Sequence, residues 1–265
     1  MFSLSGFDML RKLGLSLLLA VACCSCSKGD YEVAPPPGVE GASLVGNTGC
    51  FECHTNLVQG YLSSSHAALY NKDPKWQGMS GCEACHGPGS EHVAVGGGRG
   101  GHIINPRHDP EACLRCHQSV RTKFRLPHRH PVLEGDMNCV QCHDPHGPDI
   151  MRPSGGVGFA RLNESCAQCH RSQARQFVFQ HEAMREGCVV CHDPHGSFND
   201  KMLVQNDANL CLKCHAQVQG LGVLAGELFI GKVNHTFQLA QGTCWSAGCH
   251  QGVHGSNIHP RFRVR

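Results

Sequence analysis

The chain has 265 residues, a formal net charge of +2, 32 glycines and only 6% aromatic residues. A charge this close to zero argues against a nucleic-acid-binding protein, which carries a clear basic excess. The scarcity of aromatic residues argues against a conventional hydrophobic core, whereas 19 cysteines and 20 histidines indicate cofactor or metal chemistry.

The first 22 residues are typical of a secretory signal peptide. Two basic residues precede an apolar run, Leu13–Ala22, which is too short to span a membrane. Cleavage after Ala22 could be an ordinary signal-peptidase cut or a lipoprotein cut that lipidates Cys23. We favour lipidation at Cys23, because the ordinary cut would leave three spare thiols in an oxidising compartment.

Residues 23–47 are then predicted to form a lipid attachment point and a flexible tether, since they are rich in serine, glycine and proline. Either cut places the protein beyond the cytoplasmic membrane, where c-type haems are assembled. Residue 24 is not aspartate, which by resemblance to bacterial lipoproteins suggests the outer membrane. We therefore predict a periplasmic protein that is anchored to the outer membrane through its lipid.

Residues 48–260 contain seven copies of Cys-x-x-Cys-His, the attachment signature for c-type haem. Composition alone would give about 0.1 copies. In this signature two thiolates add to the haem vinyl groups and the histidine is an axial iron ligand. The predicted attachment cysteines are Cys50, Cys53, Cys82, Cys85, Cys113, Cys116, Cys139, Cys142, Cys166, Cys169, Cys188, Cys191, Cys211 and Cys214, with His54, His86, His117, His143, His170, His192 and His215 as ligands.

An eighth, stretched copy has four residues between Cys244 and Cys249, and its histidine is His250. The two extra residues must loop out, which a glycine before the second cysteine makes easier. The pair could bind haem, form a disulfide, form a single thioether or join nearby histidines in a zinc site. We favour an eighth haem, because His235 and His254 flank this motif as other histidines flank the other even-numbered motifs.

Each even-numbered motif has one histidine upstream and another shortly downstream. These eight histidines equal the number of distal ligands that eight bis-histidine haems require, and they divide residues 48–260 into four haem doublets. The predicted distal ligands are His66, His92, His130, His146, His181, His195, His235 and His254. Left over are His102, His108, His128 and His259, and the choice of His130 over His128 rests only on its closer match to the position of His181.

The histidines that lie three residues after a motif histidine, His146 and His195, cannot serve their own motifs. His146 lies one helical turn after His143, on the same side, so it cannot reach the opposite face of the same iron. We predict that His146 and His195 ligate neighbouring haems and clamp them together. Two histidines on every iron leave no open site for a substrate, so the pattern favours an electron-transfer protein over an enzyme.

Roughly 30 residues per haem cannot bury an apolar core of their own. The haems are therefore expected to form the core of an elongated chain that is mostly coil, with short α-helices at the motifs and little or no sheet. Residues 261–265 form a basic tail.

The even-numbered motif segments resemble the periplasmic decahaem cytochromes of the MtrA/DmsE type, found in porin–cytochrome conduits. The resemblance runs from about Asn47 to Pro260, and the sequence departs from it in having eight motifs rather than ten and a stretched last motif. It is carried by the phrase from Cys82 to His92, by His130-Pro131-Val132, by the Asp-Pro-His-Gly turns at 144–147 and 193–196, and by His254-Gly255-Ser256-Asn257.

The resemblance implies a chain of haems inside an outer-membrane β-barrel that relays electrons from the periplasm to an extracellular cytochrome. The expected partners are that β-barrel, other cytochromes, and redox donor and acceptor proteins. Alternatives are a periplasmic electron shuttle, an extracellular filament in which a spare histidine ligates a haem of the next subunit, and a multihaem reductase. A reductase often has Lys in place of a motif histidine, and the sequence contains no Cys-x-x-Cys-Lys.

Overall fold

The computed structural model describes residues 35, 37–72, 81–147, 156–215, 227–242 and 244–263. The predicted signal peptide, the lipidation site Cys23, most of the tether and the last two residues of the basic tail lie outside the described residues. Within these ranges, no helix is both long and apolar enough to cross a bilayer.

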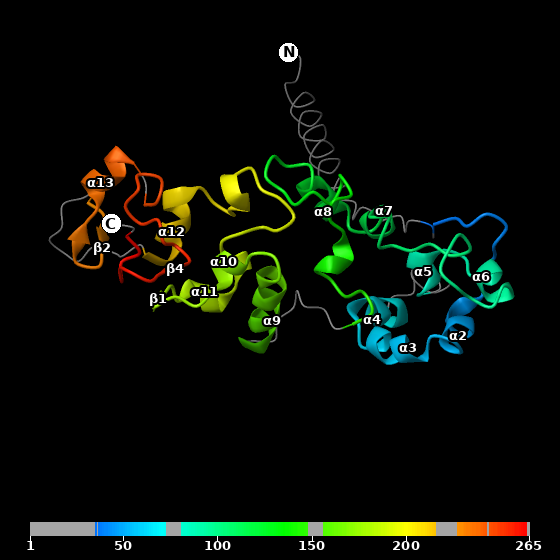
Figure 1. Cartoon of the computed structure of the whole chain (residues 1–265). Helices are drawn as coiled ribbons and strands as arrows, with labels where there is room; N and C mark the ends of the chain where they lie inside the picture. Colours follow the sequence, from blue (N-terminus) through cyan, green and yellow to red (C-terminus); the bar gives the residue numbers. More distant parts are fainter. Residues whose placement is uncertain are drawn as a thin grey trace, which may run out of the picture. The chain divides into compact units, whose positions relative to one another are not determined.

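The helices are short (Figure 1), and most of them contain part of a motif or adjoin one. In the first half they are α2 (Gly46–Phe51), α3 (Thr55–Leu62), α4 (Ser65–Lys72), α5 (Glu83–His86), α6 (Ser90–Ala94), α7 (Glu111–Leu114) and α8 (Gln118–Lys123). In the second half they are α9 (Gly156–Ala167), α10 (Arg171–Ala174), α11 (Ala183–Glu186), α12 (Asp207–His215) and α13 (Thr236–Gln241). The 3-10 turns are η2 (Cys139–Gln141), η3 (Cys188–Val190) and η4 (Asp200–Met202).

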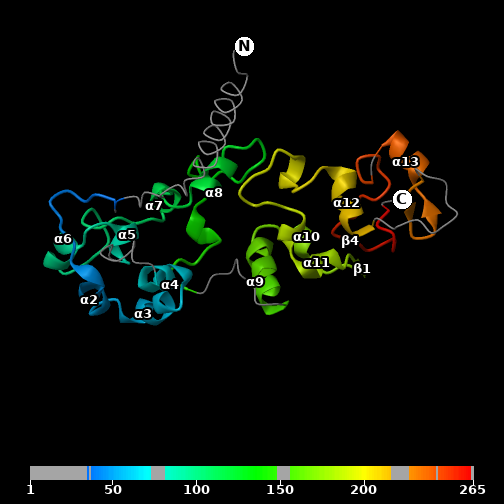
Figure 2. The ribbon, with the colours of Figure 1, turned by 180° about the vertical axis from the view of Figure 1, so that it is seen from behind.

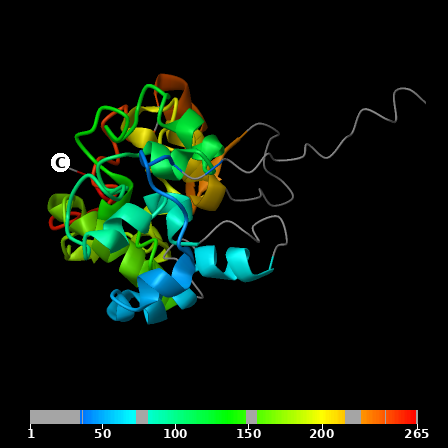
Figure 3. The same cartoon turned by 90° about the vertical axis from the view of Figure 1, so that its right-hand side faces the viewer.

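Sheet is confined, in the described ranges, to two antiparallel pairs of two-residue strands. β1 (Phe179–Gln180) pairs with β4 (Gly255–Ser256), and the two lie side by side in Figure 2. β2 (Phe229–Ile230) and β3 (Val233–Asn234) form a hairpin. Coil connects these elements (Figure 3). The predicted combination of short helices and coil with little sheet is confirmed.

Apolar burial within the polypeptide is slight. In the part of the chain that the structure describes, the buried apolar side chains are Tyr61, Ala67, Ala112, Leu114, Phe124, Val132 and Leu162. At roughly 1.5–3 kcal/mol for each large side chain, this set cannot offset the entropy of ordering so many residues. The polypeptide alone therefore lacks the core that a domain of this length requires.

A buried carboxylate joins the first two motifs. Glu83, inside the second motif, is 1% exposed. Its Oε1 accepts hydrogen bonds from the backbone N–H groups of Val45 (2.9 Å) and Gly89 (2.8 Å), and its Oε2 accepts one from Gly46 (3.0 Å). Gly46 begins α2, which carries Cys50. Because a buried charge is tolerated only when it is well hydrogen-bonded, these three bonds fix the start of the first motif against the second.

Candidate haem-binding sites

The unmodified motifs share one backbone hydrogen bond. In the first six, the N–H of the motif histidine donates to the carbonyl of the first cysteine at 2.9–3.1 Å. The seventh motif lies within the last turns of α12. This bond closes one helical turn and brings the two cysteines, three residues apart, to the same side. Paired thiols on one side are what attachment to one haem requires.

The stretched motif keeps this hydrogen bond. The N–H of His250 donates to the carbonyl of Cys244 at 2.9 Å, although two more residues intervene. Gly248, with φ of +82°, occupies the left-handed region that favours glycine, and its N–H donates to Trp245. Cys244 and Cys249 are free thiols and form no disulfide with each other. The extra residues thus bulge out and leave the cysteine–histidine relation intact.

Trp245 in this bulge contacts the segment that follows the sixth motif. The ammonium nitrogen of Lys201 lies 4.4 Å from the centre of the Trp245 ring, a cation–π arrangement. The carbonyl of Lys201 accepts a hydrogen bond from Nδ1 of His192, the sixth motif histidine. The stretched motif is therefore tied to the sixth motif through one lysine.

Seven motif histidines each face a second histidine, with ring centroids 6.0–6.3 Å apart. An iron–nitrogen bond is about 2 Å and the nitrogen lies about 1 Å from the ring centre, so two imidazoles on opposite sides of one iron have centroids about 6 Å apart. The spacing therefore fits haem iron. These facing pairs are His54–His92, His117–His66, His86–His146, His170–His130, His143–His195, His215–His181 and His192–His254.

The pairing follows one rule along the chain. The histidine downstream of motif four, six or eight faces the histidine two motifs earlier, as His146 faces His86. The histidine upstream of motif two, four or six faces the motif histidine of motif three, five or seven, respectively. For example, His130, upstream of motif four, faces His170 of motif five. His92 departs from the rule, because no motif lies two earlier, and it faces His54 of motif one.

Backbone carbonyls orient many of these rings. Nδ1 lies 2.7–3.0 Å from a carbonyl oxygen in six histidines, which leaves Nε2 as the unprotonated nitrogen that can bind metal. They are His86, His130, His181, His192, His235 and His250. The acceptor for His130 is Pro194, beside His195, and the acceptor for His181 is Val253, beside His254. The segment around each of these carbonyls thus carries one predicted distal histidine and orients the ring of another.

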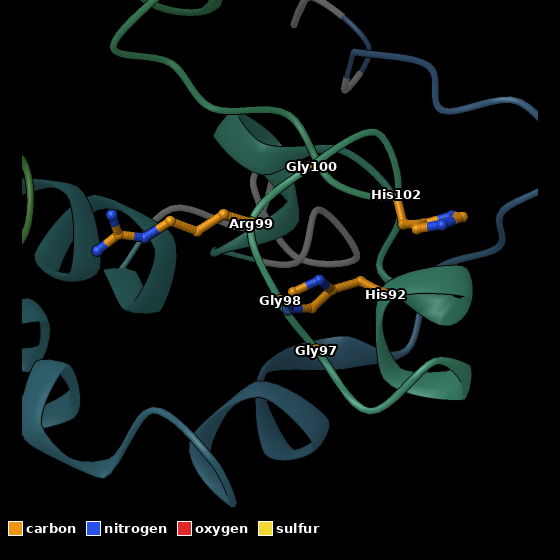
Figure 4. A pocket seen from close by; sticks show the side chains of 6 residues that line it. All are labelled: His92, Gly97, Gly98, Arg99, Gly100 and His102. Carbon is orange, nitrogen blue, oxygen red and sulfur yellow. The ribbon is translucent and has the colours of Figure 1, made fainter.

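The spare histidines have other surroundings, and in the described part of the chain none of the four belongs to a facing pair. His128 forms a β-bridge with Ser197 that holds the 193–196 turn beside His130. Nδ1 of His259 accepts a hydrogen bond from the N–H of Arg261 (3.0 Å), so its proton is on Nε2 and that nitrogen is not free for a metal. His102 shares a small pocket with His92 but points away from it (Figure 4).

The motif cysteines bring consecutive motifs together. The first cysteines of motifs one and two, three and four, and five and six lie close enough for their thiols to interact: Cys50 with Cys82, Cys113 with Cys139 and Cys166 with Cys188. Second cysteines are electrostatic neighbours across the next junctions: Cys85–Cys116, Cys142–Cys169 and Cys191–Cys214. Burial, together with the nearby Cys50, raises the pKa of Cys82 to about 12. Motifs one to seven thus adjoin in sequence order, through two alternating kinds of junction.

The eighth site is assembled differently. His235 and His250, both in described segments, belong to no facing pair, although both have the same Nδ1–carbonyl orientation as the paired histidines. His250 donates to the carbonyl of Arg261 at 2.7 Å. The sequence predicts His235 as a distal ligand, and the structure does not bring its ring opposite that of His250.

Comparison with known proteins gives matches over most of the chain. The doubled CXXCH motif family matches residues 130–175 and 181–220, and the family described as cytochrome c554 and c-prime matches residues 37–87. Each doubled-motif match begins at an upstream histidine, His130 or His181, and includes an even-numbered motif with the odd-numbered motif that follows.

Among curated proteins, the chain is 31% identical over 223 residues to "Multiheme cytochrome MtrA" of Shewanella baltica, which covers 82% of the chain and 60% of that relative. It is 27% identical over 179 residues to "C-type polyheme cytochrome OmcB" of Geobacter sulfurreducens, covering 58% of the chain and 23% of the relative. For OmcC of the same organism the identity is 25% over 243 residues, with 79% and 31% covered. The chain therefore spans less than two thirds of the first relative's length and under a third of the other two.

Proposed function

Because the chain is a multihaem c-type cytochrome with paired Cys-x-x-Cys-His motifs, we propose that it conducts electrons along a row of haems held by residues 48–260. When bound, each haem supplies one-electron redox chemistry. The observation that carries the proposal is the ordered adjacency of motifs one to seven, in which seven histidine pairs at 6.0–6.3 Å fit bis-histidine iron.

The chain's own residues have three tasks in this function. The cysteine pairs of all eight motifs would attach the haems covalently, and the motif histidines would bind their irons. The distal histidines are those predicted from the sequence: His66, His92, His130, His146, His181, His195, His235 and His254. Since each distal ligand comes from another motif's segment, ligation also fixes the distance between neighbouring haems, on which the rate of electron hopping depends.

Full coordination also determines what the row does not do. Two histidines on an iron leave no position for a substrate, so the paired sites favour transfer over catalysis. The names of the relatives, multiheme and polyheme cytochromes, agree with an electron-transfer role.

The interruption of the row provides a direct test. In a film of holo-protein bridging two electrodes, replacing Cys139 and Cys142 by serine removes the fourth haem and should lower the current by orders of magnitude. Removing the first motif through Cys50 and Cys53 changes only one end and should have a much smaller effect. Equal effects of the two variants would contradict sequential transfer. Intact mass of each protein gives the haem number independently.

We further propose that the row serves a conduit through the outer membrane, with a β-barrel and other cytochromes as partners. The predicted signal peptide, the candidate lipid anchor at Cys23 and the resemblance of residues 47–260 to porin–cytochrome carriers support this assignment. Co-purification of the tagged mature protein with a β-barrel protein, in detergent, would support the conduit. Recovery of the protein alone in a soluble periplasmic fraction would favour a shuttle instead.

A further inference from the structure

Among the described residues, the pairing rule leaves groups unmatched at the first two motifs and at the eighth motif. At the first two motifs, His92 has no motif two places earlier to face. The first motif likewise has no preceding even-numbered motif whose upstream histidine could face it. The structure closes this end by pairing His92 with His54 at 6.3 Å, with the rings nearly parallel at 13°. At the other end, the unmatched groups are His235 and the motif histidine His250. These two are not paired, so the two ends of the row differ.

His235 is mounted on its own segment. Its N–H donates to the carbonyl of Leu228 (2.7 Å), and its Nδ1 lies 3.0 Å from the carbonyl of Val233. The N–H of Leu228 in turn donates to the hydroxyl of Thr236 at 2.6 Å. All these partners lie within eight residues, in or beside the β2–β3 hairpin. His235 is therefore held in place by its own hairpin.

Two of the three corresponding histidines of the earlier repeats, His130 and His181, are held by distant segments. Nδ1 of His130 is bonded to the carbonyl of Pro194, 64 residues away, and Nδ1 of His181 to that of Val253, 72 residues away. Moving either ring off its iron would break a contact between two repeats. Moving His235 breaks no contact of this kind, so its displacement costs less.

The proximal half of the eighth site, in contrast, is fully formed. His250 is oriented by the carbonyl of Arg261 and hydrogen-bonded to Cys244, as in the other motifs. His259 is not a substitute ligand, because its Nδ1 accepts a hydrogen bond and its Nε2 carries the proton.

We propose that the sixth coordination position of the eighth haem, opposite His250, is exchangeable. His235 occupies it reversibly, and a neutral diatomic π-acceptor ligand such as carbon monoxide takes its place on the reduced iron. This inference rests on the proposed haem attachment at Cys244 and Cys249. It gives one end of the row a ligand-binding site that the other seven sites lack, because their distal histidines are held in facing pairs.

Carbon monoxide titration of the dithionite-reduced, full-length holo-protein tests the proposal. The difference spectrum should saturate at one carbon monoxide per protein. His235→Ala should keep that stoichiometry and bind about ten-fold tighter or more, since the internal competitor is gone. His108→Ala, at a leftover histidine that belongs to no facing pair in the described residues, is the matched control and should leave both unchanged. His254→Ala is a positive control. It removes the histidine that faces His192 in the sixth motif, so it should open that haem and add a second equivalent of bound carbon monoxide.

Three results would overturn the proposal. No uptake by the wild-type protein means that the sixth position is firmly occupied. Uptake with an affinity that His235→Ala does not change means that His235 is not the competitor. An intact mass with seven haems removes the site itself. None of these results affects transfer along the first seven haems, whose failure would instead appear in the conductance of the variant that lacks the fourth haem.

Discussion

Replacement of Glu83 by glutamine should loosen the contact between the first two motifs. The side chain is 1% exposed and its two oxygens accept three backbone N–H bonds of 2.8–3.0 Å. A glutamine can keep its carbonyl oxygen at the Oε1 position and retain the bonds from Val45 and Gly89. Its amide group would then face the N–H of Gly46, and that donor loses its acceptor.

The size of the effect follows from these three bonds. A hydrogen bond to a charged group contributes about 1.5–3 kcal/mol and a neutral one about 1 kcal/mol. Losing one charged bond and neutralising two others therefore costs about 2.5–7 kcal/mol. At about 1.4 kcal/mol per tenfold, the lower value makes local opening of residues 43–47 about 60-fold more frequent.

Hydrogen–deuterium exchange of the holo-protein, followed by mass spectrometry, measures this opening in peptides that contain Val45 and Gly46. Glu134→Gln is the matched control, because Glu134 is exposed and pairs with Arg129 at the surface. That variant should leave the exchange of these peptides unchanged. Less than a threefold change in Glu83→Gln would refute the assigned role of the carboxylate.

Three further predictions concern single residues. His130→Met should raise the potential of one haem by on the order of 0.1 V, seen by spectroelectrochemistry, while His128→Met should not; equal shifts would contradict the choice between them. His195→Ala should give one high-spin haem per protein in the EPR spectrum, and an unchanged spectrum would exclude His195 as a ligand. In a denaturant titration, Gly196→Ala should lower the free energy of unfolding by about 2–4 kcal/mol, because its φ is +149° and an added Cβ would clash with a backbone carbonyl. Gly231→Ala, in open space at φ +61°, should lower it by only about 1 kcal/mol.

Local chemistry made part of this arrangement predictable. The attachment motifs are defined by spacing within five residues, and the exclusion of His146 from its own iron needed only helical geometry. The structure places His146 beside His86 and His195 beside His143, each two motifs back.

Which motif each distal histidine serves depends on the path of the chain, which spacing alone does not encode. His66 faces His117, 51 positions away, across the intervening second motif. His92 follows its motif histidine by six residues, whereas the other downstream histidines follow theirs by three or four. It faces His54, the histidine of the preceding motif.

The buried carboxylate could not be predicted from the sequence either. Glu52 and Glu83 both lie between the cysteines of a motif, at different positions within it. Only the fold distinguishes them, since Glu52 is exposed whereas Glu83 meets three backbone donors.

The pairing of each even-numbered motif with the one two places ahead has a consequence for how such chains change in length. Duplicating a segment with one even and one odd motif adds two haem irons together with one upstream and one downstream histidine. The number of distal histidines therefore stays equal to the number of irons. Adding a single motif would leave a histidine or an iron unmatched and would put all later partners out of register. Evolution can therefore lengthen or shorten such a chain two haems at a time with only its ends needing redesign.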